Sequence, residues 1–576
     1  MTDQTRVVEP AEGPEADGRR ETPSPQPPTG ETRERPSGAR APLLGDMAAL
    51  AGLVAVVAFL WGRAWRTWFW LDEGIAAGIS SHSLASIPDL LRQESSPPLY
   101  YLLLHLWMSV FGSSDAQTHV LSLLFALAVV PAALWAGWSL FGRRTGWMCA
   151  LLAVLNPFLA FYATETRMYS MAALLSLLVT ATYLHAFVFR RRRYLPAFAV
   201  FLVLLLYTHN WGLLVAGAAG LGLVPLLVLG ADRRRLLLDA ALAFAAVGLA
   251  YAPWLPTLAY QVGEDLQPWA QKPTLDLVRD EVARTVGDVE GVVVLGLGAG
   301  VGLAIVLRRP WSRTAVAVAV TAMMVAVVVA AGWASSVWAY RYLAVVVPPI
   351  LLVLAAGLAR GGRPAVAALA VAAFLSAPIA VKTPPYLKSN AKAVAEAASA
   401  RLGPADLVIS PDLQMVPLLA AYLPAGLRYA TTSGVVPDER IVEWHNSMER
   451  LRRHDPGVTI PPLVEALPVG AHVFVACPPT GTADLSGRRT GLAQSPTTLG
   501  GTFTGRTSGS EVSDQALLTV PPPEGVSVFH ELIRLRCREV KTMVLGDPRL
   551  RLDLELKAPS TVSNTPVDGY VLTKLR

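Results

Sequence analysis

One stretch of the sequence decides the fold class: Thr314-Ala-Val-Ala-Val-Ala-Val-Thr-Ala-Met-Met-Val-Ala-Val-Val-Val-Ala-Ala-Gly-Trp333. It carries no charged residue, and a helix of about 20 apolar residues covers the roughly 30 Å of hydrocarbon in a bilayer. The whole chain agrees with it, since 53% of the 576 residues are hydrophobic and only 16% are charged. Soluble domains carry about 25% charged residues. We therefore expect a polytopic α-helical membrane protein.

Comparable apolar runs lie on both sides of this stretch, and each of them predicts a membrane-spanning helix. Together with the quoted stretch they make about eleven expected spans, at 43–62, 118–141, 146–164, 169–189, 195–208, 211–230, 236–259, 290–307, 314–333, 343–359 and 364–381.

Short basic clusters between these runs predict the topology. They are Arg143–Arg144, Arg190–Arg193, Arg233–Arg235, Arg308–Arg309 with Arg313, and Arg360 with Arg363. Two spans separate each cluster from the next, so all five fall on one side, which the positive-inside rule makes cytoplasmic. Arginines just before residue 43 place the N-terminus on the same side. The formal net charge of +6 thus comes from loops rather than from a basic face, and no nucleic-acid partner is expected.

The number of membrane crossings also indicates whether a further apolar stretch, 97–112, spans the bilayer. The N-terminus and Arg143 share one side only if the crossings between them are even in number, and 43–62 and 118–141 already supply two. The stretch 97–112, which opens with Pro97–Pro98, is therefore expected to lie along the outer interface of the membrane. The C-terminus should be outside, in a multi-pass protein of the inner (plasma) membrane.

Composition divides the chain into three expected parts. Residues 1–41 are rich in Pro, Gly, Glu and Arg, which predicts a disordered cytoplasmic tail. Residues 42–383 form the membrane domain, with 63–117 as its first outer loop. Residues 384–576 mix polar and apolar residues and predict an extracytoplasmic α/β domain. Its expected strands lie at 406–410, 427–430 and 472–476, its helices at 388–401 and 437–453, and a flexible loop at 484–516.

Cysteine usage gives no sign of a metal or redox site. The chain has three cysteines and no Cys-x-x-Cys pair, so thiolate metal ligation lacks support. Cys477 and Cys537 both fall in the expected outer domain, where they form either a disulfide, if the compartment is oxidising, or two buried thiols.

Ionisable and aromatic residues gather at the expected outer ends of the spans, where charge is costly and is a sign of function. Each residue alone has a structural explanation: a solvated acid pair, an arginine reaching the headgroups, a hydrogen-bonded core histidine or an interfacial tryptophan. Together they supply arginine forks for a lipid phosphate and a carboxylate that can accept the proton of an attacking hydroxyl. They are Asp72, Glu73, Glu165, Arg167, Tyr169, His209, Arg341 and Tyr342.

Four local motifs carry a resemblance to a known family. They are Leu71-Asp72-Glu73, then Ser96-Pro-Pro-Leu-Tyr100-Tyr101, then Glu165-Thr-Arg167-Met-Tyr169, and Arg341-Tyr342-Leu343 ahead of Pro348, with Tyr207-Thr-His209 as a weaker fifth. Over roughly residues 45–380 the sequence resembles the integral-membrane glycosyltransferases of the C-type (GT-C) fold. That group includes protein O-mannosyltransferases, aminoarabinose transferases that modify lipid A, and transferases that add galacturonic acid to lipopolysaccharide cores.

The resemblance implies a donor and a set of roles. The donor would be a polyprenyl-phosphate-linked sugar, not a nucleotide sugar, and the reaction a single inverting displacement at the anomeric carbon. Asp72 would be the general base, and Glu73 its supporting neighbour. Arg167, Arg341, Tyr342, Glu165, Tyr169, His209, Tyr100 and Tyr101 would bind the donor phosphate or sugar. The resemblance does not imply a cofactor. Some relatives bind a divalent metal at the acids of this loop, but here no third ligand is evident beside Asp72 and Glu73.

One position departs from the family pattern: Ser96 stands where many members carry His before the Pro-Pro pair. The sugar stays open, and the acceptor could be a cell-envelope glycan, a lipid or a protein. Two other function classes remain. A transporter or flippase of lipid-linked sugars would carry polar residues near the bilayer midplane and internal repeats. A non-catalytic scaffold presenting the outer domain is the third.

Overall fold

The structure is a computed structural model that describes residues 44–63, 67–229, 232–264, 267–270, 272–335, 337–382, 388–479, 528–559, 561–562 and 564–576. The tail expected at 1–41 and the loop expected at 484–516 lie outside the described residues.

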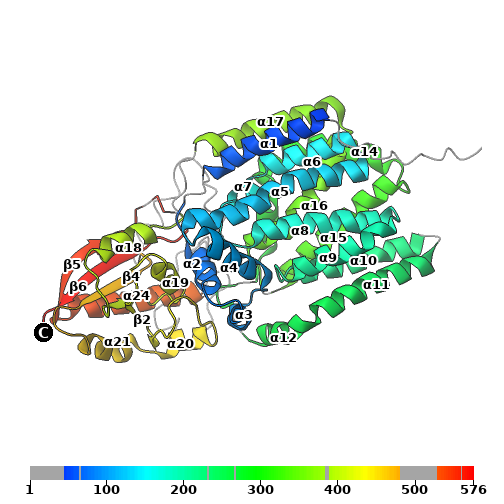
Figure 1. The fold of residues 1–576 in the computed structure, drawn as a ribbon. Helices are drawn as coiled ribbons and strands as arrows, with labels where there is room; N and C mark the ends of the chain where they lie inside the picture. The colour runs from blue at the N-terminus through cyan, green and yellow to red at the C-terminus, as the bar shows by residue number, and fades with distance from the viewer. Residues whose placement is uncertain are drawn as a thin grey trace, which may run out of the picture. The chain divides into compact units, whose positions relative to one another are not determined.

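Each of the eleven apolar runs coincides with helix. The helices are α1 (Leu44–Gly62), α5 (Asp115–Phe141), α6 (Arg143–Leu155) followed by α7 (Pro157–Tyr162), α8 (Tyr169–Tyr183) followed by the π-helix η1 (Leu184–Val188), α9 (Leu195–Leu206), α10 (Gly212–Leu229), α11 (Arg233–Tyr251) followed by α12 (Leu255–Gly263), α14 (Asp288–Leu307), α15 (Arg313–Ala334), α16 (Val347–Leu358) and α17 (Gly362–Lys382). They lie side by side as a bundle (Figure 1).

The described helices make the chain a multi-pass membrane protein. Six of them are long and apolar enough to cross a bilayer, and large apolar side chains such as Phe59, Leu249 and Phe374 are exposed on the bundle. In lipid such exposure carries no penalty, because the surroundings are as apolar as the side chain. Several other helices are shorter, so the count of eleven crossings stays a prediction.

The run 146–164 is not one continuous helix. It breaks at Asn156, whose side-chain oxygen accepts a hydrogen bond from Leu159 N at 3.0 Å and caps α7. Pro157 follows, and a proline disfavours helical geometry in the residue before it. The apolar run thus predicted the presence of helix here but not this interruption.

The connection between α1 and α5 carries three short helices: α2 (Leu71–Ser80), α3 (Ile87–Glu94) and α4 (Leu99–Phe111). Helix α4 covers the stretch expected along the interface. Its 13 residues extend about 20 Å at 1.5 Å per residue, which is short of the hydrocarbon thickness. Helix α3 packs on α12, where Gln261 Nε2 donates to the backbone oxygen of Leu91 at 2.9 Å.

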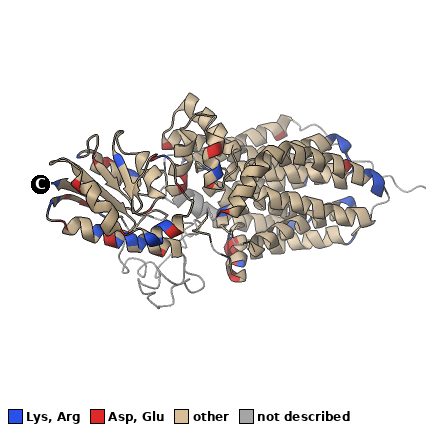
Figure 2. Cartoon of the chain, turned by 90° about the horizontal axis from the view of Figure 1, so that it is seen from below, with Lys and Arg blue, Asp and Glu red and all other residues tan. Residues whose placement is uncertain are grey.

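Basic residues gather at the end of the bundle that lies away from the C-terminal α/β region (Figure 2). Two ion pairs connect helix ends there. Arg143 Nη2 is 2.7 Å from Asp46 Oδ1, and Arg192 Nη2 is 2.6 Å from Asp239 Oδ1. These pairs join the starts of α1 and α6, and the start of α11 to the turn before α9. Each pair therefore brings together two of the connections that the topology argument places on one side.

Glycines allow α14 and α16 to approach each other closely. Gly298 and Gly302 on α14 face Gly357 and Gly361, at the end of α16. A Cβ atom on Gly302 would collide with the backbone oxygen of Gly357, and one on Gly361 would lie 2.6 Å from the backbone oxygen of Gly298. Small residues four apart are the usual means of close helix packing in membranes.

The described residues from 388 onward form an α/β region around a six-stranded mixed sheet of order β3-β2-β1-β4-β6-β5. Strand β1 is parallel to β2 and to β4, and the other pairs are antiparallel. The strands are β1 (Leu407–Ile409), β2 (Arg428–Thr431), β3 (Gly434–Val435), β4 (His472–Cys477), β5 (Leu550–Leu556) and β6 (Asp568–Lys574); the helices are α18 (Ala391–Ser399), α19 (Met415–Ala420), α20 (Ser447–Arg453), α21 (Pro456–Glu465) and α24 (Val528–Gly546). The three expected strands and the helix expected at 388–401 are confirmed. The helix expected at 437–453 is present only as α20, and residues 437–446 are turn or irregular. Cys477 and Cys537 are free, buried thiols.

The α/β region packs directly on α2 through α19 (Figure 1). A Cβ atom on Gly74 would lie 2.9 Å from the backbone nitrogen of Leu418, so α19 touches the bare backbone of α2. Just before α2, the backbone N–H of Phe69 donates to Tyr422 Oη at 2.7 Å. Phe69 and Ala77 share an apolar core with residues of the α/β region. Helix α2 therefore packs between the bundle and α19 of the α/β region.

We expect Gly302→Ala to lower the thermal midpoint of the detergent-solubilised protein by several degrees, because the added methyl group pushes α14 away from α16. Gly300→Ala is the matched control, since a Cβ atom there meets nothing within 4 Å. It should be neutral or mildly stabilising, because alanine favours helix over glycine by about 1 kcal/mol. Equal midpoints for the two variants would contradict the close packing.

Candidate functional site

Asp72 lies in the first turn of α2 and faces two arginines from distant parts of the chain. Its Oδ2 atom is 3.5 Å from Nε of Arg341 and 4.0 Å from Nε of Arg167. Arg167 comes from the connection between α7 and α8, and Arg341 from the 3₁₀-helix η4 (Tyr340–Val345) that precedes α16. All three side chains are at least 87% buried.

The acid and the arginines are close but not hydrogen-bonded to each other through these atoms. Asp72 Oδ2, Arg167 Nε and Arg341 Nε are buried without a hydrogen-bond partner among the described residues. A buried polar atom left unpaired costs about 1–3 kcal/mol, and more if it is charged. Arg167 is held from its other side, where Nη1 donates to Tyr101 Oη at 3.0 Å. The unpaired atoms point to a place where a ligand completes the hydrogen bonding.

These groups line an open cavity of about 640 Å³. Five of the predicted site residues line it: Asp72, Arg167, His209, Arg341 and Tyr342. The wall also includes Glu94, Ser96, Asn210, Trp211, Gln267, Trp269, Gln414 and Trp444. Residues more than 250 positions apart in the sequence therefore converge on one site.

Two other features of the cavity wall matter for an anionic ligand. His209 is neutral, because burial, with the charges of Arg167 and Arg341, lowers its pKa to about 3. Its Nδ1 accepts a hydrogen bond from Trp211 N at 3.1 Å, so Nε2 carries the proton and is a donor. The guanidinium of Arg341 lies 4.7 Å from the ring centroid of Trp269, a cation–π distance.

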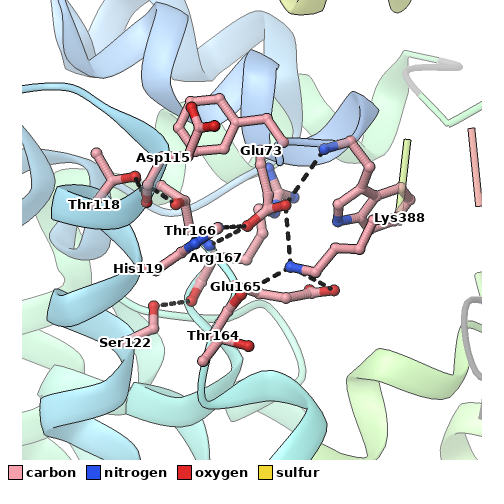
Figure 3. Close-up of polar contacts among 12 residues, drawn as sticks. Glu73, Asp115, Thr118, His119, Ser122, Thr164, Glu165, Thr166, Arg167 and Lys388 are labelled. Atoms are coloured by element: carbon pink, nitrogen blue, oxygen red, sulfur yellow. Dashed lines mark hydrogen bonds and ion pairs between the residues drawn. The ribbon is translucent and has the colours of Figure 1, made fainter. Parts of the chain in front are cut away.

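Glu73, the neighbour of Asp72, is fully buried in a separate network (Figure 3). Its Oε1 accepts from His119 Nε2 at 2.6 Å and from Thr166 N at 2.7 Å. Its Oε2 accepts from Lys388 Nζ at 3.1 Å and from Trp70 N at 3.3 Å. Burial alone would raise the pKa of Glu73, but the charges of Lys388 and His119 hold that pKa below its usual value. This carboxylate is committed to joining α2, α5, the Arg167 connection and the α/β region.

Glu165 shares the same lysine but is in the opposite protonation state. Its Oε1 lies 3.8 Å from Lys388 Nζ, and burial raises its pKa despite that charge. One lysine cannot fully compensate two buried carboxylates. Glu73 therefore holds the negative charge, and Glu165 is the acid that is kept neutral.

Three of the four predicted tyrosines lie behind the cavity wall, whereas Tyr342 lines it. Tyr101 Oη accepts from Arg167, and Tyr100 Oη shares a hydrogen bond of 2.9 Å with Ser122 Oγ. The ring of Tyr169 lies 6.0 Å from the guanidinium carbon of Arg167. All three are fully buried. They surround Arg167 and its neighbouring helices.

The sequence analysis missed several residues of this site. Lys388 follows the last apolar run as a single lysine, which no motif marks. Glu94 lines the cavity, and its Oε2 accepts from Trp444 Nε1 of the α/β region at 2.6 Å. Burial raises the pKa of Glu94 to about 7, although Arg167 and the Trp444 bond oppose the shift. Glu94 could have been found from the sequence, because it lies just before the Ser96-Pro-Pro-Leu-Tyr100-Tyr101 motif.

In the described parts of the chain no group of three His, Cys, Asp or Glu side chains lies close enough to hold a metal ion. Both oxygens of Glu73 are used by the protein. The residues around Asp72 therefore do not fit a metal site built on these two acids.

We expect Lys388→Met to destabilise the protein strongly at neutral pH, because it leaves the charge of Glu73 buried without its lysine. Breaking a buried pair costs about 3–5 kcal/mol. The loss should shrink on acidification, since protonated Glu73 no longer needs the cation. Thermal midpoints between pH 4 and 8 measure both effects.

Lys392→Met is the control for that variant. Lys392 pairs with Asp115 at 3.1 Å but is one-third exposed, so its loss should be smaller. Similar midpoints for the two variants would contradict the role given to Lys388.

We expect Glu94→Gln to gain stability relative to the native protein as the pH rises from about 4.5 to 7. With a folded pKa near 7 and an ordinary unfolded pKa, the native protein binds the extra proton and loses stability across this window. The amide has no proton to lose and escapes the penalty. Midpoints of both proteins at pH 4, 5.5 and 7.5 test this, and a constant difference would refute it.

Comparisons with known proteins agree on the fold. No protein-family model and no curated protein matches the sequence. Crystal structures of ArnT from Cupriavidus metallidurans, in the apo state and bound to undecaprenyl phosphate, superpose with a TM-score of 0.55 at 17% identity, covering 77% of this chain and 95% of theirs. The archaeal oligosaccharyltransferase AglB from Archaeoglobus fulgidus, in complex with an inhibitory peptide and a dolichol-phosphate, gives a TM-score of 0.50 at 11% identity and covers 90% of this chain and 80% of its own. The chain therefore has the GT-C fold of integral-membrane glycosyltransferases.

Proposed function

We propose that the protein transfers a sugar from a polyprenyl-phosphate donor to an acceptor on the extracytoplasmic side of the inner membrane. One observation carries the proposal: the buried carboxylate of Asp72 faces the guanidinium groups of Arg167 and Arg341 at the wall of a cavity, with unpaired polar atoms on all three side chains. The similar structures support the donor class, since ArnT is seen bound to undecaprenyl phosphate and AglB in complex with a dolichol-phosphate.

The chemistry assigned to this site is a single displacement. The oxygen of the acceptor hydroxyl attacks the anomeric carbon, the bond from that carbon to the phosphate oxygen breaks, and the polyprenyl phosphate leaves with the bond electrons. The hydroxyl proton passes to the carboxylate of Asp72, which acts as general base. The configuration at the anomeric carbon inverts.

The arginines stabilise the charge that grows on the leaving phosphate. Arg167 and Arg341 are already charged and desolvated, so they need little reorganisation when the bond breaks. The Nε2–H group of neutral His209, and Tyr342, which also lines the cavity, hydrogen-bond the phosphate or the donor sugar. Tyr100, Tyr101 and Tyr169 hold Arg167 and the helices around it.

Glu73 and Glu165 act as positioning residues. Both oxygens of Glu73 are occupied by protein donors, so it has no lone pair in a favourable position for an attacking hydroxyl. Its bonds fix the start of α2 and hence the direction of Asp72. Glu165 lies 3.8 Å from the lysine that pairs with Glu73.

The membrane orientation follows from the basic end of the bundle. We assign that end to the cytoplasm by the positive-inside rule, which puts Asp72 and the α/β region on the opposite side of the inner membrane. Residues 42–383 then form the transferase domain, and residues 384–576 an extracytoplasmic domain that covers α2.

The test is turnover by purified protein in nanodiscs supplied with radiolabelled polyprenyl-phosphate sugars, with release of the sugar from the lipid as readout. We expect Asp72→Asn to lower the rate at least 100-fold, because the amide cannot accept the proton. Asp89→Asn, which changes an exposed acid of the same outer loop, should leave the rate unchanged.

Two results would overturn the proposal. If the native protein never releases sugar but moves the intact donor across the bilayer, it is a flippase. If Asp72→Asn turns over the donor as fast as the native protein does, then Asp72 is not the base.

A further inference from the structure

A second cavity of about 650 Å³ lies on the side of Asp72 that faces the α/β region. It shares Asp72, Trp269, Arg341 and Gln414 with the first cavity. The rest of its wall comes mainly from the α/β region, from the residues after β1, from α24 and from the segment before β6. The proposed base therefore borders two neighbouring spaces.

Unpaired donors line this second cavity. Asn564 Nδ2 and Thr565 Oγ1 have no hydrogen-bond partner among the described residues, and the two side chains belong to residues that are only 5% and 4% exposed. The indole Nε1 of Trp70, a residue 5% exposed, is in the same state. Native proteins leave few buried polar groups unpaired, because each costs about 1–3 kcal/mol. Three at one cavity indicate a ligand rich in hydrogen-bonding groups.

The segment that carries Asn564 and Thr565 is held firmly in place. The backbone N–H groups of both residues donate to the backbone oxygen of Lys388, at 3.1 and 2.8 Å. Two residues on, Val567 exchanges two hydrogen bonds with the Asn390 side chain, at 2.7 and 2.8 Å. The side chains are therefore presented to the cavity by a fixed backbone, as a binding site requires.

The charges of the second cavity do not favour an anion. Arg341 faces Asp72, and Arg534 forms an ion pair with Glu531. Burial lowers the pKa of His530 to about 4, so this histidine is uncharged at neutral pH. Asp412 adds a carboxyl group to the wall. Among the described residues that line this cavity, Arg341 and Arg534 are the cations and each faces a carboxylate, whereas two arginines converge at the first cavity.

Aromatic rings complete the wall. Trp70 and Trp269 both line the cavity, and indole rings offer broad apolar faces beside an N–H donor. A sugar ring presents apolar C–H faces and a rim of hydroxyls. Tryptophan together with unpaired amide and hydroxyl groups matches those two properties.

We propose that the second cavity binds an uncharged glycan as acceptor, with Asn564 and Thr565 hydrogen-bonding its hydroxyls and Asp72 facing the hydroxyl that attacks. The inference rests on the proposed function and selects one of its three acceptor classes. A polypeptide or a phosphorylated lipid as acceptor would contradict it.

The test separates acceptor binding from donor chemistry. Purified protein receives a radiolabelled polyprenyl-phosphate sugar, first with water alone and then with neutral oligosaccharides of mannose, glucose, galactose or arabinose. We expect an oligosaccharide to accelerate sugar release and to become glycosylated. Asn564→Ala with Thr565→Val should raise the KM for that oligosaccharide 10–100-fold, which corresponds to two lost hydrogen bonds, and leave donor hydrolysis by water unchanged.

Protein stability distinguishes a binding role from a structural one. Thr565→Val removes a buried hydroxyl that has no partner, so the ligand-free variant should be at least as heat-stable as the native protein. Thr432→Val is the matched control, because Thr432 Oγ1 is also buried and unpaired but lies at neither cavity. It should leave the KM for the oligosaccharide unchanged.

The inference fails if the double variant leaves this KM unchanged, or if a Ser/Thr-rich peptide or a phosphorylated glycolipid is glycosylated while every oligosaccharide is refused. If the native protein turns over no donor at all, the proposed function fails separately. The quenching of tryptophan fluorescence by the oligosaccharides then shows, without any turnover, whether the second cavity binds a glycan. Binding that weakens in Asn564→Ala supports it, and no binding overturns it.

Discussion

The buried carboxylate of Glu73 is the constraint on which the site depends. Four donors from four parts of the chain converge on its two oxygens (Figure 3). A charge in such surroundings is tolerated only when it is paired and hydrogen-bonded. Any displacement of α2, of α5, of the Arg167 connection or of the α/β region would leave that charge uncompensated. The network thus holds in one arrangement the elements that carry Asp72 and Arg167.

Asp72 and Glu73 show how neighbouring acids acquire different roles. Successive residues on a helix point about 100° apart, so one carboxylate enters the interior network while the other reaches the cavity wall. The cavity side has unpaired atoms on Asp72 and on both arginines, whereas both oxygens of Glu73 are hydrogen-bonded. Rigid support behind an unsatisfied surface is the arrangement that preorganises a site for a ligand.

Much of the fold could be predicted from the sequence, because hydrophobic length alone identifies helices that cross lipid. The order of short motifs also indicated that Asp72, Arg167 and Arg341 would meet.

Other features of the fold and the site had no local signal in the sequence. Lys388 lies beyond the last apolar run, outside any of the motifs. Its partner Glu73 lies 315 positions earlier in the sequence. Glu94 and Trp444 meet only because the α/β region packs on the outer loop. The break at Asn156 depends on one proline within an otherwise uniform run. Asn564 and Thr565 matter because they lack partners, which only coordinates reveal.

The pairing of Glu73 with Lys388 also bears on how the protein matures. The ribosome makes the acid long before the lysine, and domains tend to fold in the order of synthesis. We expect α2 to settle only when the last third of the chain has been made and has begun to fold, with Glu73 either protonated or hydrated until then. A chain that ends before Lys388 would leave the buried charge of Glu73 without its cation.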